Sequence, residues 1–154
     1  MGLIKELMLE PGLRPQVIQE CCTLIDAEVA DKKGLSGIAI KAGYSVFRAV
    51  KKTALAEAVD NLLDDFVEVL DGQHARYLQA RRADETLKAY LVAHKQEVAE
   101  SLLAITDRRQ EASTHKTVKG AYGKLRPQAA LHVQEALPRV ADLLERHLAR
   151  PRPA

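Results

Sequence analysis

The stretch that decides the fold reads TALAEAVDNLLDDFVEVL, residues 53–70. Its large apolar side chains recur three or four residues apart, at positions 55, 59, 62, 63, 66 and 70. That spacing places them on one face of an α-helix and leaves the acidic residues between them on the other face. The segment therefore predicts an amphipathic helix that buries one side against a core.

The same period extends over most of the chain, and strand-forming residues occur mainly as isolated Val and Ile at helical spacing. We therefore expect an all-α protein, a compact bundle of about six to eight helices. Capping residues and helix breakers predict where individual helices begin and end. Ser36 is expected to cap one helix, Asp71-Gly72 to end the helix quoted above, Pro127 to open the last helix and Pro138 to kink or split it.

The length of 154 residues predicts a single domain, residues 1–154, with a core large enough to fold without disulfides. A net charge of +2 implies no partner by itself. The longest uncharged run, residues 127–134, is far shorter than the roughly 20 residues that a membrane span needs. Because the N-terminus lacks a secretory signal and Cys21 and Cys22 are predicted to be free thiols, we expect a cytoplasmic protein that is not integral to a membrane.

Alignment of the chain with itself brings residues 40–48 onto residues 118–126. Lys, Tyr and Arg coincide in these two stretches, and small residues meet small residues between them. This alignment predicts two three-helix repeats, residues 15–72 and 93–150, packed about a pseudo-twofold axis. Chance similarity of two amphipathic helices is the alternative, because identity outside this block is sparse.

Each of the two stretches places a Lys, a Tyr and an Arg on one side of its helix. The two stripes consist of Lys41, Tyr44 and Arg48, and of Lys119, Tyr122 and Arg126. In the interpretation that we favour, each basic helix pairs with an acidic neighbour and the Tyr lies at the seam between them. In the alternative, which we do not favour, the stripes bind an anionic partner, either a nucleic acid or the anionic lipids of a membrane surface.

The helix predicted after Ser36 is unusually rich in small residues, among them Gly43, and Gly120 and Gly123 occupy the second stretch. Glycine inside a helix costs about 1 kcal/mol relative to alanine. We therefore expect another helix to approach closely at these glycines, inside the bundle or at the seam of a homo-oligomer. A carrier of a small apolar ligand is a further alternative.

Motifs typical of catalysis are absent from the sequence, which has no phosphate loop, Rossmann fingerprint, nucleophile elbow or His-Glu-x-x-His. The five histidines, at positions 74, 94, 115, 132 and 147, are expected at the surface, and the cysteines lack zinc-ligand spacing. We name no catalytic residue, no metal ligand and no cofactor. The leading hypothesis is a non-enzymatic scaffold or binding module, with a homo-oligomer or a protein as partner.

Four stretches read DAEVA at 26–30, GLSGIAIKAGY at 34–44, AYGKLRP at 121–127 and EALP at 135–138. Together they resemble the signature of an uncharacterised family of all-helical bacterial proteins, slightly shorter than this chain. The resemblance covers nearly the whole sequence. It implies a small cytoplasmic helical protein of bacterial origin, and it supplies no activity, cofactor or site.

Overall fold

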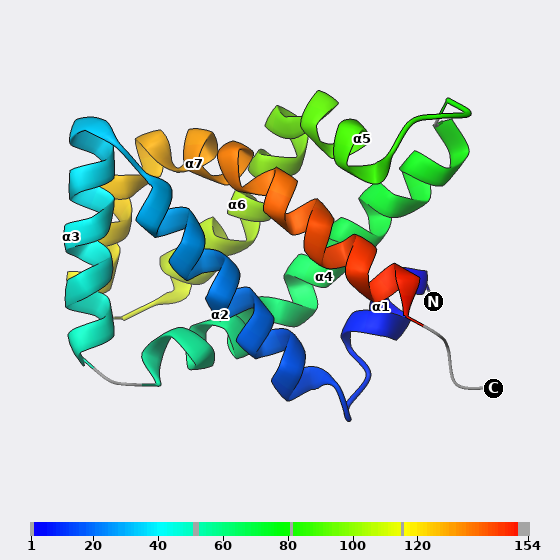
Figure 1. Cartoon of the computed structure of the whole chain (residues 1–154). Helices are drawn as coiled ribbons and strands as arrows, with labels where there is room; N and C mark the ends of the chain where they lie inside the picture. The colour runs from blue at the N-terminus through cyan, green and yellow to red at the C-terminus, as the bar shows by residue number, and fades with distance from the viewer. Residues whose placement is uncertain (1, 51–52, 81, 115, 151–154) are drawn as a thin grey trace.

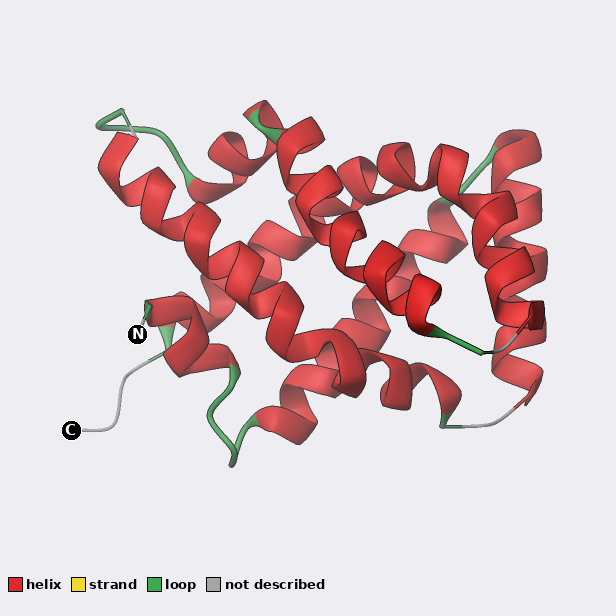
Figure 2. Cartoon of the chain, turned by 180° about the vertical axis from the view of Figure 1, so that it is seen from behind, coloured by secondary structure: helices red, strands yellow, loops and turns green. Residues whose placement is uncertain are grey.

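Seven helices make up most of the part of the chain that the structure describes, residues 2–50, 53–80, 82–114 and 116–150 of a computed structural model (Figure 1). Those residues contain no strand, as the view from behind also shows (Figure 2). The predicted all-α class is therefore confirmed. In chain order the helices are α1 (Leu3–Met8), α2 (Arg14–Asp31), α3 (Gly34–Val50), α4 (Ala54–Ala80), α5 (Leu87–Ala93), α6 (Lys95–Ala112) and α7 (Lys116–Ala149).

Two predicted helix boundaries are wrong, the end at Asp71-Gly72 and the start at Ser36. α4 continues to Ala80, so Asp71-Gly72 does not end it. Val67, His74 and Tyr77 are all buried and keep the helical period across Gly72. Burial of these side chains offsets the roughly 1 kcal/mol that a helical glycine costs. In the same way, α3 begins at Gly34, two residues before the predicted cap at position 36.

α7 is one helix of 34 residues that contains both of its prolines. The prediction that Pro127 opens a separate helix is wrong, and Pro138 does not split α7. A helical proline costs about 3 kcal/mol because it removes a hydrogen bond, and the buried side chains of Leu137, Ala141 and Leu144 offset that cost. Figure 1 shows the first turns of α7, in gold, rising beside α3 before the helix bends, as helices with an internal proline often do.

The main hydrophobic core draws on six of the helices: α1, α2, α4, α5, α6 and the second half of α7. Its buried members are Ile4, Met8, Val17, Leu63, Val67, Tyr77, Leu87, Tyr90, Leu91, Val98, Leu102, Leu137, Ala141, Leu143 and Leu144. Burial of this apolar surface is the main favourable contribution to folding. Even the short α1 is fixed in place by two fully buried side chains.

α3 lies outside this core. Among the described residues, none of α3 and none of α7 before Val133 belongs to the core or packs against it as a partly buried apolar side chain. Yet α3 is the most apolar of the five long helices. In both views it forms one outer edge of the molecule. No described helix, α3 included, combines the length and the apolar character needed to cross a bilayer.

The two segments of the predicted repeat have helices that differ in continuity. α2 and α6, which begin the two segments, each have 18 residues. After α2 the chain forms two separate helices, α3 and α4, whereas after α6 it forms the single helix α7. A duplication of the two segments thus stays a prediction. The sequence similarity between them is confined to short stretches and does not extend over whole helices.

Truncation of a core leucine and of an α3 leucine should have very different effects. Leu144→Ala should lower the free energy of unfolding by about 2–5 kcal/mol, because it leaves a cavity beside fully buried neighbours. Leu35→Ala should change it by less than about 0.5 kcal/mol, because Leu35 is 87% exposed. Urea denaturation followed by circular dichroism measures both. Equal losses would contradict the placement of α3 outside the core.

Candidate functional site

The polar side of α3 attaches this helix to the body of the protein. Tyr44 Oη donates a hydrogen bond to the carboxylate of Asp26 in α2. Arg48 Nη1 lies 3.4 Å from Asp26 Oδ1 and 3.3 Å from Tyr44 Oη. The Arg48 guanidinium also lies 5.8 Å from the centre of the Tyr44 ring, within range of a cation–π contact. We call Asp26, Tyr44 and Arg48 the first Tyr–Arg cluster.

A second Tyr–Arg cluster, Asp107, Tyr122 and Arg126, joins α6 to the first half of α7. Tyr122 Oη donates a hydrogen bond of 2.5 Å to Asp107 Oδ1. Arg126 donates to both Asp107 oxygens, from Nε at 2.9 Å and from Nη2 at 3.1 Å. Arg126 Nη2 also lies 3.2 Å from Glu100 Oε2. The same three residue types therefore connect a pair of helices in both places.

Tyr44, Tyr122 and Asp107 are each held in one protonation state at neutral pH. Burial, followed by the hydrogen bond to Asp26, raises the pKa of Tyr44 to about 12. Burial and the Asp107 carboxylate likewise raise the pKa of Tyr122. Hydrogen bonds from Arg126 and Tyr122 lower the pKa of Asp107. Both phenols therefore remain hydrogen-bond donors, and Asp107 remains a charged acceptor.

The structure divides the six predicted anion-binding residues into two kinds. Arg48 and Arg126 are paired with carboxylates of their own chain. Lys41 and Lys119 have no ion-pair partner among the described residues. A surface hollow of about 490 Å³ beside the second cluster contains Glu100, Asp107 and Glu111 around Arg126, so acids outnumber cations there. That all six residues bind an anion stays a prediction, and the lysines are the members left available for it.

Sequence reasoning missed the two acids on which the clusters depend. Asp26 and Asp107 are each one of several carboxylates in α2 and α6, and their role follows from contacts with helices that come later in the chain. One signal was present. The separation of these two acids along the chain is close to the separation of Tyr44 from Tyr122.

The side of α3 opposite the first cluster is apolar and open. Leu35 is 87% exposed, and Ile38 and Val46 are each 66% exposed. This outward face of α3 consists of Leu35, Ile38, Ala39, Ala42, Gly43, Val46 and Ala49, all of them exposed. It contains no charged residue over about four helical turns.

The glycines of this region do not pack as predicted. We expected close helix contacts at Gly43, Gly120 and Gly123, yet apart from the adjoining backbone of the same helix, no described atom lies within 4 Å of a Cβ placed at any of them. Close packing at these three glycines inside the bundle is therefore wrong for the described residues, and packing at the seam of a homo-oligomer stays a prediction. Gly37 is different. A Cβ there would lie 2.7 Å from the backbone carbonyl carbon of Lys32, so this position requires glycine.

Lysines accompany α3 and the first turns of α7. Five of them, none with an ion-pair partner among the described residues, belong to residues 33–50 and 116–126, which we call the basic end: Lys33, Lys41, Lys116, Lys119 and Lys124. Figures 1 and 2 show α3 and the first turns of α7 side by side at this end of the molecule. The basic end therefore combines an exposed apolar face with uncompensated positive charge.

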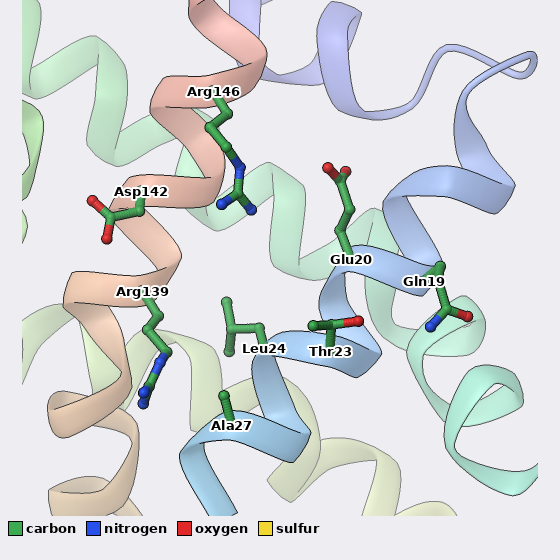
Figure 3. A pocket seen from close by; sticks show the side chains of 8 residues that line it. All are labelled: Gln19, Glu20, Thr23, Leu24, Ala27, Arg139, Asp142 and Arg146. Atoms are coloured by element: carbon green, nitrogen blue, oxygen red, sulfur yellow. The ribbon is translucent and has the colours of Figure 1, made fainter. Parts of the chain in front are cut away.

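A groove of about 360 Å³ separates α2 from the second half of α7. Figure 3 shows Arg139 and Arg146 of α7 across this groove from Glu20 and Leu24 of α2. Most of its charged groups have partners within the chain, such as Glu20, which lies 2.6 Å from His147 Nε2. Its charged lining suits an apolar ligand poorly, and the prediction of a carrier is not supported by this groove.

Two histidines lie in the interior rather than at the surface. His147 is 2% exposed and contacts Glu20, and His74 is buried in α4 beside Tyr77. The prediction of surface histidines is therefore wrong for both, and position 115 lies outside the described residues. Within the described part of the chain, no three His, Cys, Asp or Glu side chains are grouped so that they could hold a metal ion.

An ion-pair cluster around the buried Lys32 and Glu28 adjoins the groove at Arg139. Lys32 is 8% exposed, with Nζ 3.3 Å from Glu28 Oε1 and 3.6 Å from Glu135 Oε1. Arg139 pairs with the other oxygen of Glu28 and with Asp31. Glu28 is thus held by two cations from different elements, which connects α2 to α7.

A model of a family of unknown function, DUF6918, matches residues 4–148. The chain belongs to DUF6918. The predicted membership of an uncharacterised helical family is confirmed, and its bacterial origin stays a prediction. No curated protein and no solved structure matches the chain. The DUF6918 region contains α3, both Tyr–Arg clusters and the groove.

Two adjacent lysines of this DUF6918 chain provide a matched test of the buried cluster. Lys32→Ala should lower the free energy of unfolding by about 1–3 kcal/mol, because it removes one of the two cations that hold the buried Glu28. Lys33→Ala should change it by less than about 0.5 kcal/mol, because Lys33 is exposed. Urea denaturation measures both. Equal effects would show that burial of the cluster does not contribute to stability.

The second Tyr–Arg cluster should make stability depend on pH. The pKa of Asp107 is lowered in the folded state, so its pairing stabilises the fold above the unfolded pKa of about 4 and is lost as the pH falls through the folded pKa. Arg126→Gln should therefore cost about 0.5–1 kcal/mol at pH 5–7, a small effect because the pair is partly exposed, and almost nothing near pH 2. Urea denaturation across this range tests it. A constant difference down to pH 2 would contradict the assignment.

Proposed function

We propose that this protein is a non-enzymatic binding module that contacts an anionic partner through its basic end. One observation carries the proposal: the five lysines of the basic end have no ion-pair partner among the described residues. The two arginines of the Tyr–Arg clusters, by contrast, are neutralised by acids of the same chain. The uncompensated charge thus comes from lysines whose ammonium groups are available to a partner.

The distribution of charge along the chain supports this proposal. Residues 32–52 and 108–126 hold twelve of the 23 Lys and Arg residues and one of the 21 acids, Glu111. The remainder of the chain is consequently acidic, although the net charge is only +2. A molecule polarised in this way is steered so that its positive end meets an anionic partner first.

A symmetric homodimer through the basic end fits these charges poorly. Residues 32–52 contain no acid, so two copies related by a twofold axis would bring lysines together without a carboxylate to receive them. Like charges placed across an interface oppose association. Self-association by another surface stays a prediction that light scattering would test.

Reversal of three lysine charges tests the proposal. The triple variant Lys41→Glu, Lys116→Glu and Lys124→Glu should lose retention on heparin at low salt, whereas the unaltered protein should be retained and elute as salt rises. In solution, removal of three phosphate or sulfate contacts should reduce the slope of log K against log salt by roughly 2–3.

A matched control alters three exposed cations that also have no ion-pair partner among the described residues but lie outside the basic end: Arg82→Glu, Lys95→Glu and Arg146→Glu. Its net charge equals that of the first variant, so its retention should stay close to that of the unaltered protein. Equal loss in both triple variants would attribute retention to net charge alone. Failure of the unaltered protein to bind at low salt would refute the proposal.

A further inference from the structure

The exposed apolar face of α3 requires an explanation that charge alone does not provide. In a monomer, the side chains of Leu35, Ile38 and Val46 stand in water. Isolated exposed apolar residues are ordinary, but a contiguous uncharged row on the most apolar long helix is typical of a contact surface. Any partner of the basic end must therefore contact apolar side chains and lysines at the same time.

We infer that the anionic partner is the surface of a lipid bilayer, on which α3 lies flat. This inference rests on the proposed function and specifies its partner. The outward face of α3 enters the boundary between headgroups and acyl chains, and the lysines remain among the anionic headgroups. An interfacial helix has this composition, with an apolar face on one side and lysines or arginines beside it.

The geometry of α3 suits a flat surface. Residues 35–49 extend over about 21 Å at 1.5 Å per residue. Because α3 forms an outer edge of the molecule, a plane can touch its whole length (Figures 1 and 2). Lys41 lies at the border of the outward face, where its long side chain can extend to the headgroups while its methylene groups lie beside Ile38.

Another kind of anionic partner would pair with the lysines of this surface but would not cover its apolar side chains. A nucleic acid would receive the lysines, but its phosphates would leave Ile38 and Val46 in contact with water and ions. The tyrosines of the two stripes, Tyr44 and Tyr122, which could stack on bases, are instead hydrogen-bonded to Asp26 and Asp107. The small outward residues, such as Ala42 and Gly43, make a shallow face that fluid acyl chains can follow without a matching set of cavities.

A sedimentation assay separates the apolar contribution from the charge contribution. The probe is a set of vesicles of phosphatidylcholine, alone or with one third phosphatidylserine. We expect the unaltered protein to bind the mixed vesicles and not those of phosphatidylcholine alone. Ile38→Asn with Val46→Asn should weaken vesicle binding at least tenfold and leave retention on heparin unchanged, because no charge is altered.

The matched control places the same polar side chain at two exposed apolar positions of α4 and α5, away from the basic end. Leu78 is 51% exposed and Val92 is exposed as well, so Leu78→Asn with Val92→Asn should bind the mixed vesicles like the unaltered protein. Since all four substituted positions are exposed, folding should be preserved, and circular dichroism checks this.

A direct probe of insertion uses the absence of tryptophan from this chain. Val46→Trp should give an emission spectrum that shifts to the blue on mixed vesicles and is quenched by brominated acyl chains, whereas Leu78→Trp should show neither effect. A quenched Val46→Trp would place α3 at the level of the acyl chains.

The possible outcomes separate the inference from the proposed function. Retention on heparin without vesicle binding would overturn the bilayer inference and leave an anionic partner of another kind. Vesicle binding that is insensitive to Ile38→Asn with Val46→Asn, with Val46→Trp unquenched, would also overturn it, because the contact would be electrostatic only. Absence of binding to both probes would overturn the proposed function as well.

Discussion

The packing of the second half of α7 against the helices around it is the constraint on which the rest of the structure depends. Leu137, Ala141 and Leu144 are almost completely buried there. Two polar contacts, Glu28 with Arg139 and Glu20 with His147, align α7 with α2 from one end of the groove to the other. The apolar burial supplies the free energy, and the two polar contacts, which are costly if mispaired, specify the register.

α3 is attached by a different kind of interaction. It contributes no described residue to the core, and its contacts with α2 depend on the Asp26 carboxylate and on the close approach of Gly37 to Lys32. Hydrogen bonds to a partly exposed carboxylate are directional but contribute little net stability. The attachment therefore determines which side of α3 faces the body and leaves the apolar side outward.

The same arrangement determines which cations remain available to a partner. Arg48 and Arg126 are used within the fold, where a planar guanidinium can donate to a carboxylate and contact a tyrosine ring at once. The lysines beside them remain at the surface. Both the exposed apolar face and the unpaired lysines of the basic end thus follow from the inward orientation of the tyrosines and arginines.

The all-α class could be predicted from sequence because apolar residues at the spacing of Leu55, Val59 and Leu62 fall on one side of the chain only when the chain is helical. Local residue choice, however, misplaced several boundaries. Gly72 and Pro127 disfavour a helix by a few kcal/mol at most, and burial of residues such as Tyr77 and Leu137, remote in sequence from their neighbours, outweighs that cost. The position of each helix end depends on the balance between this local cost and the burial of distant side chains. A local sequence pattern gives no information about that burial.

By itself, the sequence determined the helical class, the membership of one family, and the presence of two Lys-Tyr-Arg stripes, the first of them opposite an apolar face of its helix. Only the tertiary structure decided which side of α3 faces inward. A helical pattern specifies that Tyr44 and Val46 point in different directions, but it does not say which of them meets another helix. Asp26, which precedes both in the chain, accepts the hydrogen bond of Tyr44, so that side of α3 faces α2. The described apolar residues on the opposite side stay exposed.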